Sequence, residues 1–209
     1  MTRLAKLLSI GSEPLCSAAP AMPAAFEGTR WAAELEAMLA AKNGFFAFES
    51  SLHVFPAGPT VHGYDLATWN DPRGWRAAYP DLPADLLLFA EDVFGIPFCC
   101  GEAGVQRFDP ETGALEQLAT TLEDWAALVL AEFAFQTGHP LAHAWQVKHG
   151  PLAPTQRLAP KVPFVLGGAY ELDNLYAADA LESMRFRADL ARQIRDLPDG
   201  ARVKLVVGD

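Results

Sequence analysis

Apolar residues recur with a helical period in three segments of the chain. Residues 30–42, 121–137 and 179–195 repeat them at intervals of three and four, so each segment is predicted to be an amphipathic helix. Two polar signals support these starts: Thr120-Thr121-Leu122-Glu123 is typical of a capping box, and Asp179 is a favourable N-cap residue. The sequence therefore predicts three helices, over residues 30–42, 121–137 and 179–195.

Short apolar runs, separated by glycine, proline and acidic turns, fill much of the remaining chain and are typical of strands. Asp109-Pro110-Glu111-Thr112-Gly113 is typical of a hairpin turn. The expected strands are 45–55, 86–94, 97–100, 104–108, 115–118, 164–166 and 203–207. Because strands cluster in the middle and do not alternate regularly with helices, the pattern predicts an α+β fold. We expect a single domain with a central, mostly antiparallel sheet flanked by helices.

Two segments lack a clear period. Residues 1–28 contain prolines among small residues, which we interpret as an irregular N-terminal arm, with residues 29–209 as the folded α+β domain. Residues 57–83 are expected to form a long irregular loop that carries three large rings. The rings belong to Trp69, Trp75 and Tyr79. Loops of this length are usually functional or packed by their own side chains.

Composition narrows the classes of function. The chain has 209 residues, of which 51% are apolar, so it can fill a core. Lys and Arg number 16 against 26 for Asp and Glu, a net charge of −10 with no basic patch, so nucleic acid and membranes are not expected partners. Three cysteines are too few for a disulfide framework, and the apolar run 7–10 is too short for a signal peptide. We expect a cytoplasmic protein.

The candidate catalytic and metal-binding groups are weak. His139 and His143 have the i, i+4 spacing of helical zinc ligands, but the flanking HExxH pattern is absent. Cys99-Cys100 lie in an apolar strand, where thiols are buried and inert. Paired carboxylates at strand ends can do acid–base work only in a cleft, and are more often solvated. We therefore expect no metal, no cofactor and no enzymatic activity.

Acidic residues recur where the predicted strands end or turn, and we expect them to form an acidic rim that steers a basic protein partner. The set is Asp92, Asp109, Glu111, Glu171 and Asp173. The loop rings Trp69, Trp75 and Tyr79 are the expected aromatic anchors of the same binding face. The alternatives are an acidic face that is merely solvated, and rings that pack inward and hold their own loop.

The order of features between residues 86 and 130 resembles the SUKH superfamily, the Syd and yeast cell-wall-assembly-regulator homology group. Leu88–Phe98 gives an apolar strand, an aspartate, a glycine and an aromatic strand. The hairpin Val105–Gly113 follows, and Glu123-Asp124-Trp125 begins a helix. The resemblance covers this middle segment and is absent for residues 1–43. It implies a SUKH-like α+β domain.

The resemblance also implies a function. Bacterial SUKH members are largely immunity proteins, which bind and neutralise toxin domains without a cofactor. It therefore implies a non-catalytic, protein-binding module whose partner is a basic toxin domain encoded nearby, and a net charge of −10 suits such a partner. One alternative is a regulatory scaffold of the yeast cell-wall-regulator type. Another is a hydrolase that uses a carboxylate or a thiol.

Overall fold

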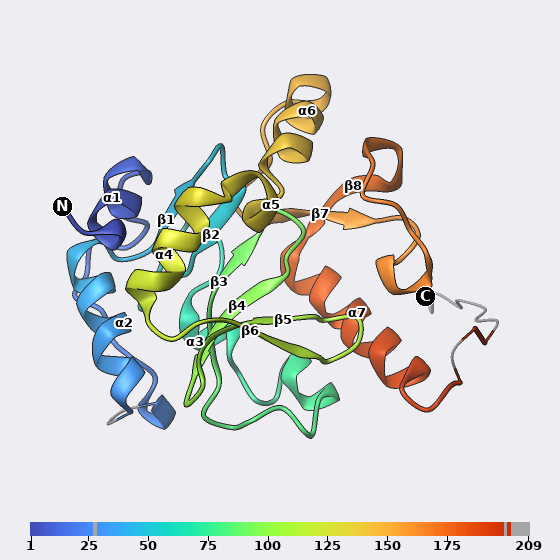
Figure 1. Ribbon diagram of the computed structural model, residues 1–209, viewed down its shortest axis with the longest axis horizontal. Coiled ribbons are helices and arrows are strands. Elements are labelled where there is room, and N and C mark those ends of the chain that lie inside the picture. Colours follow the sequence, from blue (N-terminus) through green and yellow to red (C-terminus); the bar gives the residue numbers. More distant parts are fainter. Residues whose placement is uncertain (27–28, 199, 202–209) are drawn as a thin grey trace.

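Six strands follow one another across one antiparallel sheet, each beside its neighbour in the sequence (Figure 1). They are β1 Phe45–Ala47, β2 Leu52–Val54, β3 Leu87–Asp92, β4 Pro97–Gly101, β5 Gly104–Phe108 and β6 Leu115–Ala119. The computed structural model describes residues 1–26, 29–198 and 200–201. This arrangement confirms the predicted α+β class, with short turns between consecutive antiparallel strands except for the long connection from β2 to β3.

Helices cover both faces of the sheet. They are α1 Arg3–Ile10, α2 Arg30–Ala41, α3 Leu66–Trp69, α4 Leu122–Ala131, α5 Phe133–Thr137, α6 His139–His149 and α7 Ala180–Ile194. On one face, Trp125 of α4 packs edge-on against Phe89 and Phe98, with ring centroids 5.0 and 5.6 Å apart. On the other face, the ring of Trp75, which begins the short 3₁₀ helix Trp75–Ala78, packs against the ring of Phe108. Adjacent residues of a strand point to opposite faces.

A second sheet of two strands lies beside the first. It pairs β7 Gln156–Pro160 with β8 Leu175–Asp179, and α7 follows it directly. A buried ion pair joins the two sheets, since Arg157 Nη2 lies 2.7 Å from Glu91 Oε1 of β3. Asp179 accepts hydrogen bonds from the backbone N–H groups of Leu181 and Glu182, so it caps α7 as the sequence predicts.

The N-terminal segment is more ordered than expected. Residues 1–28 were expected to be irregular, but Arg3–Ile10 form α1, and Leu7 is fully buried in the main core. The helix is held from a distance, because the Glu123 carboxylate accepts hydrogen bonds from the backbone N–H groups of Arg3 and Leu4 at 2.5 and 3.0 Å. Glu123 therefore caps α1 and not its own helix, which Thr121 caps by accepting from the Asp124 N–H.

The single strand expected at residues 45–55 is a hairpin of β1 and β2. Phe48, Glu49 and Ser50 form its turn with φ between 51° and 66°, a region that side chains other than glycine rarely adopt. Helix α6 holds this turn from outside, because Gln146 donates a hydrogen bond to the Glu49 carbonyl oxygen at 3.0 Å. The prediction was wrong because no glycine marks the turn and the contact comes from a distant helix.

Two smaller predictions also need revision. The helix expected over 121–137 divides at Glu132 into α4 and α5, so Phe133 is partly exposed and does not face the core. Residues 164–166 form a 3₁₀ turn where a strand was expected. The strand expected at 203–207 lies outside the described residues. Strands β7 and β8 were not predicted, because prolines surround the first and the second is only partly buried.

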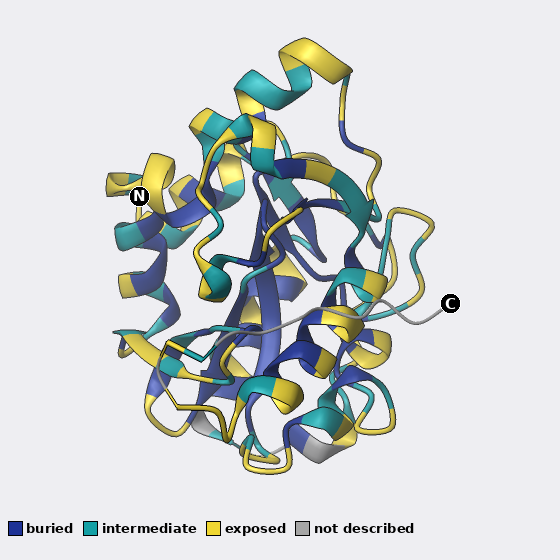
Figure 2. Cartoon of the chain, turned by 90° about the vertical axis from the view of Figure 1, so that its right-hand side faces the viewer, coloured by how far each residue is buried: buried dark blue, intermediate teal, exposed yellow. Residues whose placement is uncertain are grey.

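Every position of strands β3 and β4 is buried, whereas many exposed positions lie on the surrounding helices and turns (Figure 2). Trp125 is fully buried, as its place on the apolar face of the helix predicts. Among the helices of the described residues, none is long and apolar enough to cross a membrane.

Candidate functional site

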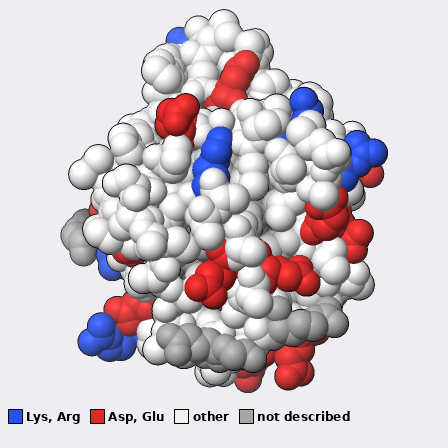
Figure 3. Space-filling view, turned by 90° about the vertical axis from the view of Figure 1, so that its left-hand side faces the viewer, with Lys and Arg blue, Asp and Glu red and all other residues white. Residues whose placement is uncertain are grey.

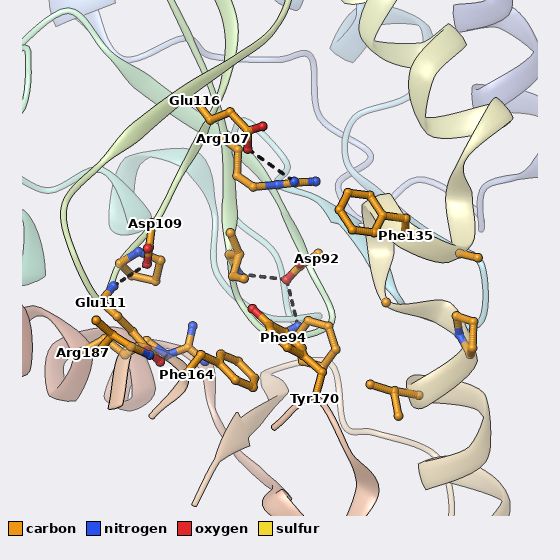
Figure 4. A pocket seen from close by; sticks show the side chains of 17 residues that line it. Asp92, Phe94, Arg107, Asp109, Glu111, Glu116, Phe135, Phe164, Tyr170 and Arg187 are labelled. Carbon is orange, nitrogen blue, oxygen red and sulfur yellow. Dashed lines mark hydrogen bonds and ion pairs between the residues drawn. The ribbon is translucent and has the colours of Figure 1, made fainter. Parts of the chain in front are cut away.

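A pocket of about 620 Å³ opens at one end of the large sheet (Figure 4). Its walls come from the β3–β4 turn, strand β5, the β5–β6 turn, helix α5 and helix α7. We call it the β3–α7 pocket. Its charged lining residues are Asp92, Asp109, Glu111 and Glu116, with Arg107 and Arg187. This volume is in the range of ligand pockets, and segments from across the chain meet here.

Asp92 ends β3 and lies at the base of the pocket, where it is only 5% exposed. Its Oδ1 atom accepts hydrogen bonds from the backbone N–H groups of Phe94 and Ile96 at 2.8 and 2.9 Å, which forms the tight β3–β4 turn. Burial raises the pKa of Asp92 to about 7, although the two N–H groups and the guanidinium groups of Arg107 and Arg187 oppose this rise. The carboxyl therefore titrates near neutral pH.

Glu111 and Arg187 lie beside each other on one side of the pocket, and each is 3% exposed (Figure 4). Glu111 Oε2 accepts a hydrogen bond from the Val165 N–H at 2.7 Å, while Oε1 lies 3.9 Å from Arg187 Nε. Within the described residues, Glu111 Oε1 and the Nε and Nη2 atoms of Arg187 have no hydrogen-bond partner. Burial raises the pKa of Glu111. The pair is therefore incompletely hydrogen-bonded, and buried polar atoms without a hydrogen-bond partner reduce the stability of the fold.

Aromatic rings form another wall of the pocket. Phe164 and Tyr170 stack face to face with centroids 3.8 Å apart, and both meet the ring of Phe94 edge-on. Tyr170 is 51% exposed, and Phe135 of α5 is 75% exposed. Burial raises the pKa of Tyr170 to about 12, so its hydroxyl is neutral at physiological pH. Exposed rings beside buried charges are typical of a binding site.

Arg107 occupies the side of the pocket nearest α5. Its Nη2 donates a hydrogen bond to the side-chain oxygen of Gln136 at 2.5 Å, and Nη1 lies 3.7 Å from the exposed carboxylate of Glu116. The guanidinium carbon lies 5.6 Å from the Phe98 ring centroid and 5.8 Å from that of Phe135. Arg107 is therefore fully engaged by the protein, unlike Arg187.

The structure divides the predicted acidic rim into two groups. Asp92, Asp109 and Glu111 line the pocket, but Asp92 and Glu111 are buried and both oxygens of Asp109 bind groups of its own turn. Glu171 and Asp173 are exposed and do not line the pocket. The expectation that all five acids stand at an exposed rim is therefore wrong for Asp92 and Glu111, which are buried. A role of these acids in binding a partner stays a prediction.

The rings of Trp69, Trp75 and Tyr79 are core residues and not surface anchors. Each is 5% exposed or less. The Trp75 indole N–H donates to the Trp69 carbonyl oxygen at 2.9 Å, and the Tyr79 hydroxyl donates to the Pro110 carbonyl oxygen at 2.5 Å. The alternative that these rings pack inward and hold their loop is therefore the arrangement in the structure.

The histidine and cysteine candidates lie elsewhere. His143 Nδ1 and His139 Nε2 approach the carboxylate of Glu49, at 2.8 and 3.8 Å, so they help to hold the strained β1–β2 turn. Among the described residues, no cluster of three or more His, Cys, Asp and Glu side chains could hold a metal. Cys99 and Cys100 are buried in β4, where burial raises the pKa of Cys99 to about 12 and that of Cys100 as well.

The sequence reasoning missed four of the main pocket residues, namely Arg107, Phe135, Tyr170 and Arg187. One of them carries a signal. Arg187 lies on the same helical face as Met184, Ala188 and Ala191, all of which are buried, so a charged side chain at this position is unusual. An arginine in the apolar face of a helix predicts a buried polar partner or a pocket.

Comparison with known proteins adds evidence on the fold. No protein-family model matches the chain, and neither does any curated protein. Among solved structures, the chain is similar to Atu4351 from Agrobacterium tumefaciens, with a TM-score of 0.56 and 13% sequence identity. The match covers 87% of this chain and 86% of that chain. The likeness is one of fold. It supports one α+β architecture over most of the chain, while membership of the SUKH superfamily stays a prediction.

Proposed function

We propose that this protein is a non-catalytic binding module that neutralises a basic toxin domain, and that a side chain of the toxin enters the β3–α7 pocket. The observation that carries the proposal is the pocket itself: the exposed rings of Phe135 and Tyr170 stand beside a surplus of carboxylates over guanidinium groups. Interface cores are enriched in aromatic residues that surround an inserted anchor. The surplus of carboxylates favours a cationic anchor.

The charge of the whole surface supports the same kind of partner. Acidic side chains outnumber basic ones on the face that carries α1 and α2 (Figure 3). On this side, a second hollow lies beside α2 and the β4–β5 turn, and all its charged lining residues are acidic, namely Glu34, Asp85 and Glu102. Such a field raises the association rate of a basic domain without fixing its orientation. The pocket supplies the fixed contact.

An enzyme that uses Asp92 as a general acid or base is the second candidate. A carboxyl with a pKa near 7 beside a pocket is typical of catalytic acids as well as of binding sites. The thiol alternative has less support, because Cys99 and Cys100 do not line this pocket and their burial keeps them protonated. A regulatory scaffold would use the same surface toward another class of partner.

The test is binding to whichever protein is encoded beside this gene. The purified domains are mixed, and the dissociation constant is measured by calorimetry for the wild type, Phe135→Ala and Val147→Ala. Val147 is the matched control, because it is 74% exposed on α6 and does not line the pocket. We expect tight binding that weakens at least tenfold in Phe135→Ala only, and loss of toxin activity in the wild-type complex.

Two results contradict the proposal. One is the absence of binding to any protein encoded nearby. The other is equal affinity in Phe135→Ala and Val147→Ala, which would place the interface away from the pocket. Turnover of a small molecule that disappears in Asp92→Asn would favour the enzyme, while capture of an unrelated partner through Phe135 would favour the scaffold.

A further inference from the structure

The β3–α7 pocket contains carboxylate oxygens that the protein does not use. Within the described residues, Glu111 Oε1 is buried without a hydrogen-bond partner, and Asp92 makes both of its hydrogen bonds through Oδ1, which leaves Oδ2 without one. Of the other two carboxylates, Asp109 closes its turn through both oxygens, and Glu116 is exposed to solvent and lies 3.7 Å from Arg107. The unused acceptors therefore belong to the two most buried acids of the pocket.

We infer that the group bound in this pocket is the guanidinium of an arginine side chain presented by the partner, held between the carboxylates of Asp92 and Glu111. The inference rests on the proposed function and specifies its contact. A guanidinium carries five N–H donors in a planar fork. Donors of this group would satisfy both acceptors, neither of which accepts a hydrogen bond from the described residues, although Arg187 Nε lies 3.9 Å from Glu111 Oε1.

The balance of charge decides between a cation and an anion. Four carboxylates and two guanidinium groups line the pocket, so an anion entering between Asp92 and Glu111 would meet two like charges. Arg187 alone favours an anion, through its free Nε and Nη2 atoms. A peptide can satisfy both kinds of group, because its backbone carbonyl oxygens can accept hydrogen bonds from Arg187 while its arginine side chain reaches the carboxylates of Asp92 and Glu111. The volume of about 620 Å³ also accommodates a short segment.

The aromatic wall favours arginine over lysine. The stacked rings of Phe164 and Tyr170 present a flat surface, and Tyr170 is half exposed toward the opening. A planar guanidinium can stack on such a ring while its edge donates hydrogen bonds, whereas an ammonium group acts as a point charge. The protein already uses such contacts, for example where Arg107 lies 5.6 Å from the ring centroid of Phe98 and 5.8 Å from that of Phe135.

Binding of this cation is expected to depend on pH through Asp92. The side chains that face it are Arg107 of β5, Asp109 and Glu111 of the β5–β6 turn, Glu116 of β6, Tyr170 and Arg187 of α7. Tyr170 stays neutral, so Asp92, assisted by Glu111, supplies the titration. With a pKa of about 7 for Asp92, affinity falls by roughly tenfold between pH 8 and pH 6, because only the ionised carboxyl binds.

The experiment uses three acetylated, amidated tripeptides, Gly-Arg-Gly, Gly-citrulline-Gly and Gly-Glu-Gly. Citrulline has the shape of arginine without the charge. Each is titrated into isotopically labelled protein, and the backbone amide shifts of Gly138 and Tyr170, which line the pocket, report binding. The variants are Asp92→Asn and Glu111→Gln, with Asp173→Asn as the control because Asp173 is exposed outside the pocket.

We expect the arginine peptide to bind at least tenfold more tightly than the citrulline peptide, and more tightly at pH 8 than at pH 6. Asp92→Asn and Glu111→Gln should each weaken it at least tenfold, while Asp173→Asn should not. Preference for the glutamate peptide would show that Arg187 makes this an anion site and overturn the inference. Equal binding of arginine and citrulline, or affinity unchanged in both folded pocket variants, would overturn it too.

The two proposals fail differently. If the toxin binds and Phe135→Ala weakens it, but Asp92→Asn and Glu111→Gln do not, the proposed function stands and the arginine contact is wrong. If the arginine peptide binds as expected but no encoded neighbour does, the pocket has the inferred preference and the proposed toxin partner is wrong.

Discussion

Asp92→Asn gives a direct test of the buried carboxyl, through stability and without any ligand. Asparagine keeps an Oδ1 acceptor for the N–H groups of Phe94 and Ile96 but cannot ionise. In the folded protein, burial raises the pKa of Asp92 from 3.8 to about 7. The folded state therefore binds a proton more tightly than the unfolded state does, and ionisation of Asp92 destabilises the fold as the pH rises from about 4 to about 7.

The size of the effect follows from this difference. At about 1.4 kcal/mol per pKa unit, a rise from 3.8 to about 7 corresponds to an upper limit of about 4 kcal/mol. At pH 4 the two proteins should have similar free energies of unfolding. By pH 8 the wild type should lose up to this amount relative to Asp92→Asn, which becomes the more stable of the two.

The assay is urea denaturation followed by tryptophan fluorescence, at pH 4, 5, 6, 7 and 8, for wild type and variant in the same buffers. Taking the difference between the two proteins removes the contribution of every other titrating group, including Glu111. A difference that stays constant from pH 4 to pH 8 would refute the argument, because it would mean that Asp92 has an ordinary pKa. A difference that grows in favour of the wild type as the pH rises would mean that ionisation of Asp92 stabilises the fold, which is the opposite of the expected sign.

Two further predictions concern the core. Trp125→Ala should reduce the free energy of unfolding by roughly 3–5 kcal/mol, since the ring is fully buried against Phe89 and Phe98; a loss below about 1 kcal/mol in denaturant unfolding would contradict this packing. Cys99 and Cys100 should not react with a thiol reagent at pH 8 until the protein unfolds, because burial keeps both thiols protonated; rapid labelling of the native protein at either position would show that β4 is open.

Local signals in the sequence predict the large sheet well. Strands β3 to β6 have uninterrupted apolar runs or a clear turn, and their partners are neighbours in the chain, so short-range pattern is enough. Helix α7 has both a cap at Asp179 and a regular apolar face. The sequence predicts these elements correctly because the residues that stabilise each of them lie within a few positions of it in the chain.

Elements that depend on distant contacts escape such reasoning. The β1–β2 turn has three residues with positive φ and is held by side chains of α6, nearly a hundred positions away. The pattern Thr120–Glu123 predicts a capping box, but Thr121 is the N-cap of α4 and Glu123 caps α1 instead. In both places a contact between residues far apart in the sequence holds the side chain, and the local pattern does not predict it.

The candidate site shows the same division. Asp92 and Glu111 were selected as acids at strand ends, but that reasoning places them on the surface, where their unperturbed charge would steer a partner. The structure places them inside, because each folds a turn through one oxygen and leaves the other free. Only the packing of α7 against the β5–β6 turn brings Arg187 near Glu111.

The two buried clusters of charge in this molecule differ in one respect that bears on function. Around Glu91, the Oε1 atom lies 3.0 Å from His53 Nδ1 and 2.7 Å from Arg157 Nη2, and none of the three residues lines the β3–α7 pocket. Burial lowers the pKa of His53 to about 4, so the neutral ring donates to the carboxylate. This cluster joins the two sheets, away from the pocket. The cluster of Asp92, Glu111 and Arg187 lines an opening instead, and its nearest opposite charges stand 3.9 Å apart. Both clusters keep buried atoms without a hydrogen-bond partner among the described residues, Glu91 Oε2 as well as Glu111 Oε1. Only the second is accessible from the pocket, and binding of a cation from outside is the contact that would offset its cost.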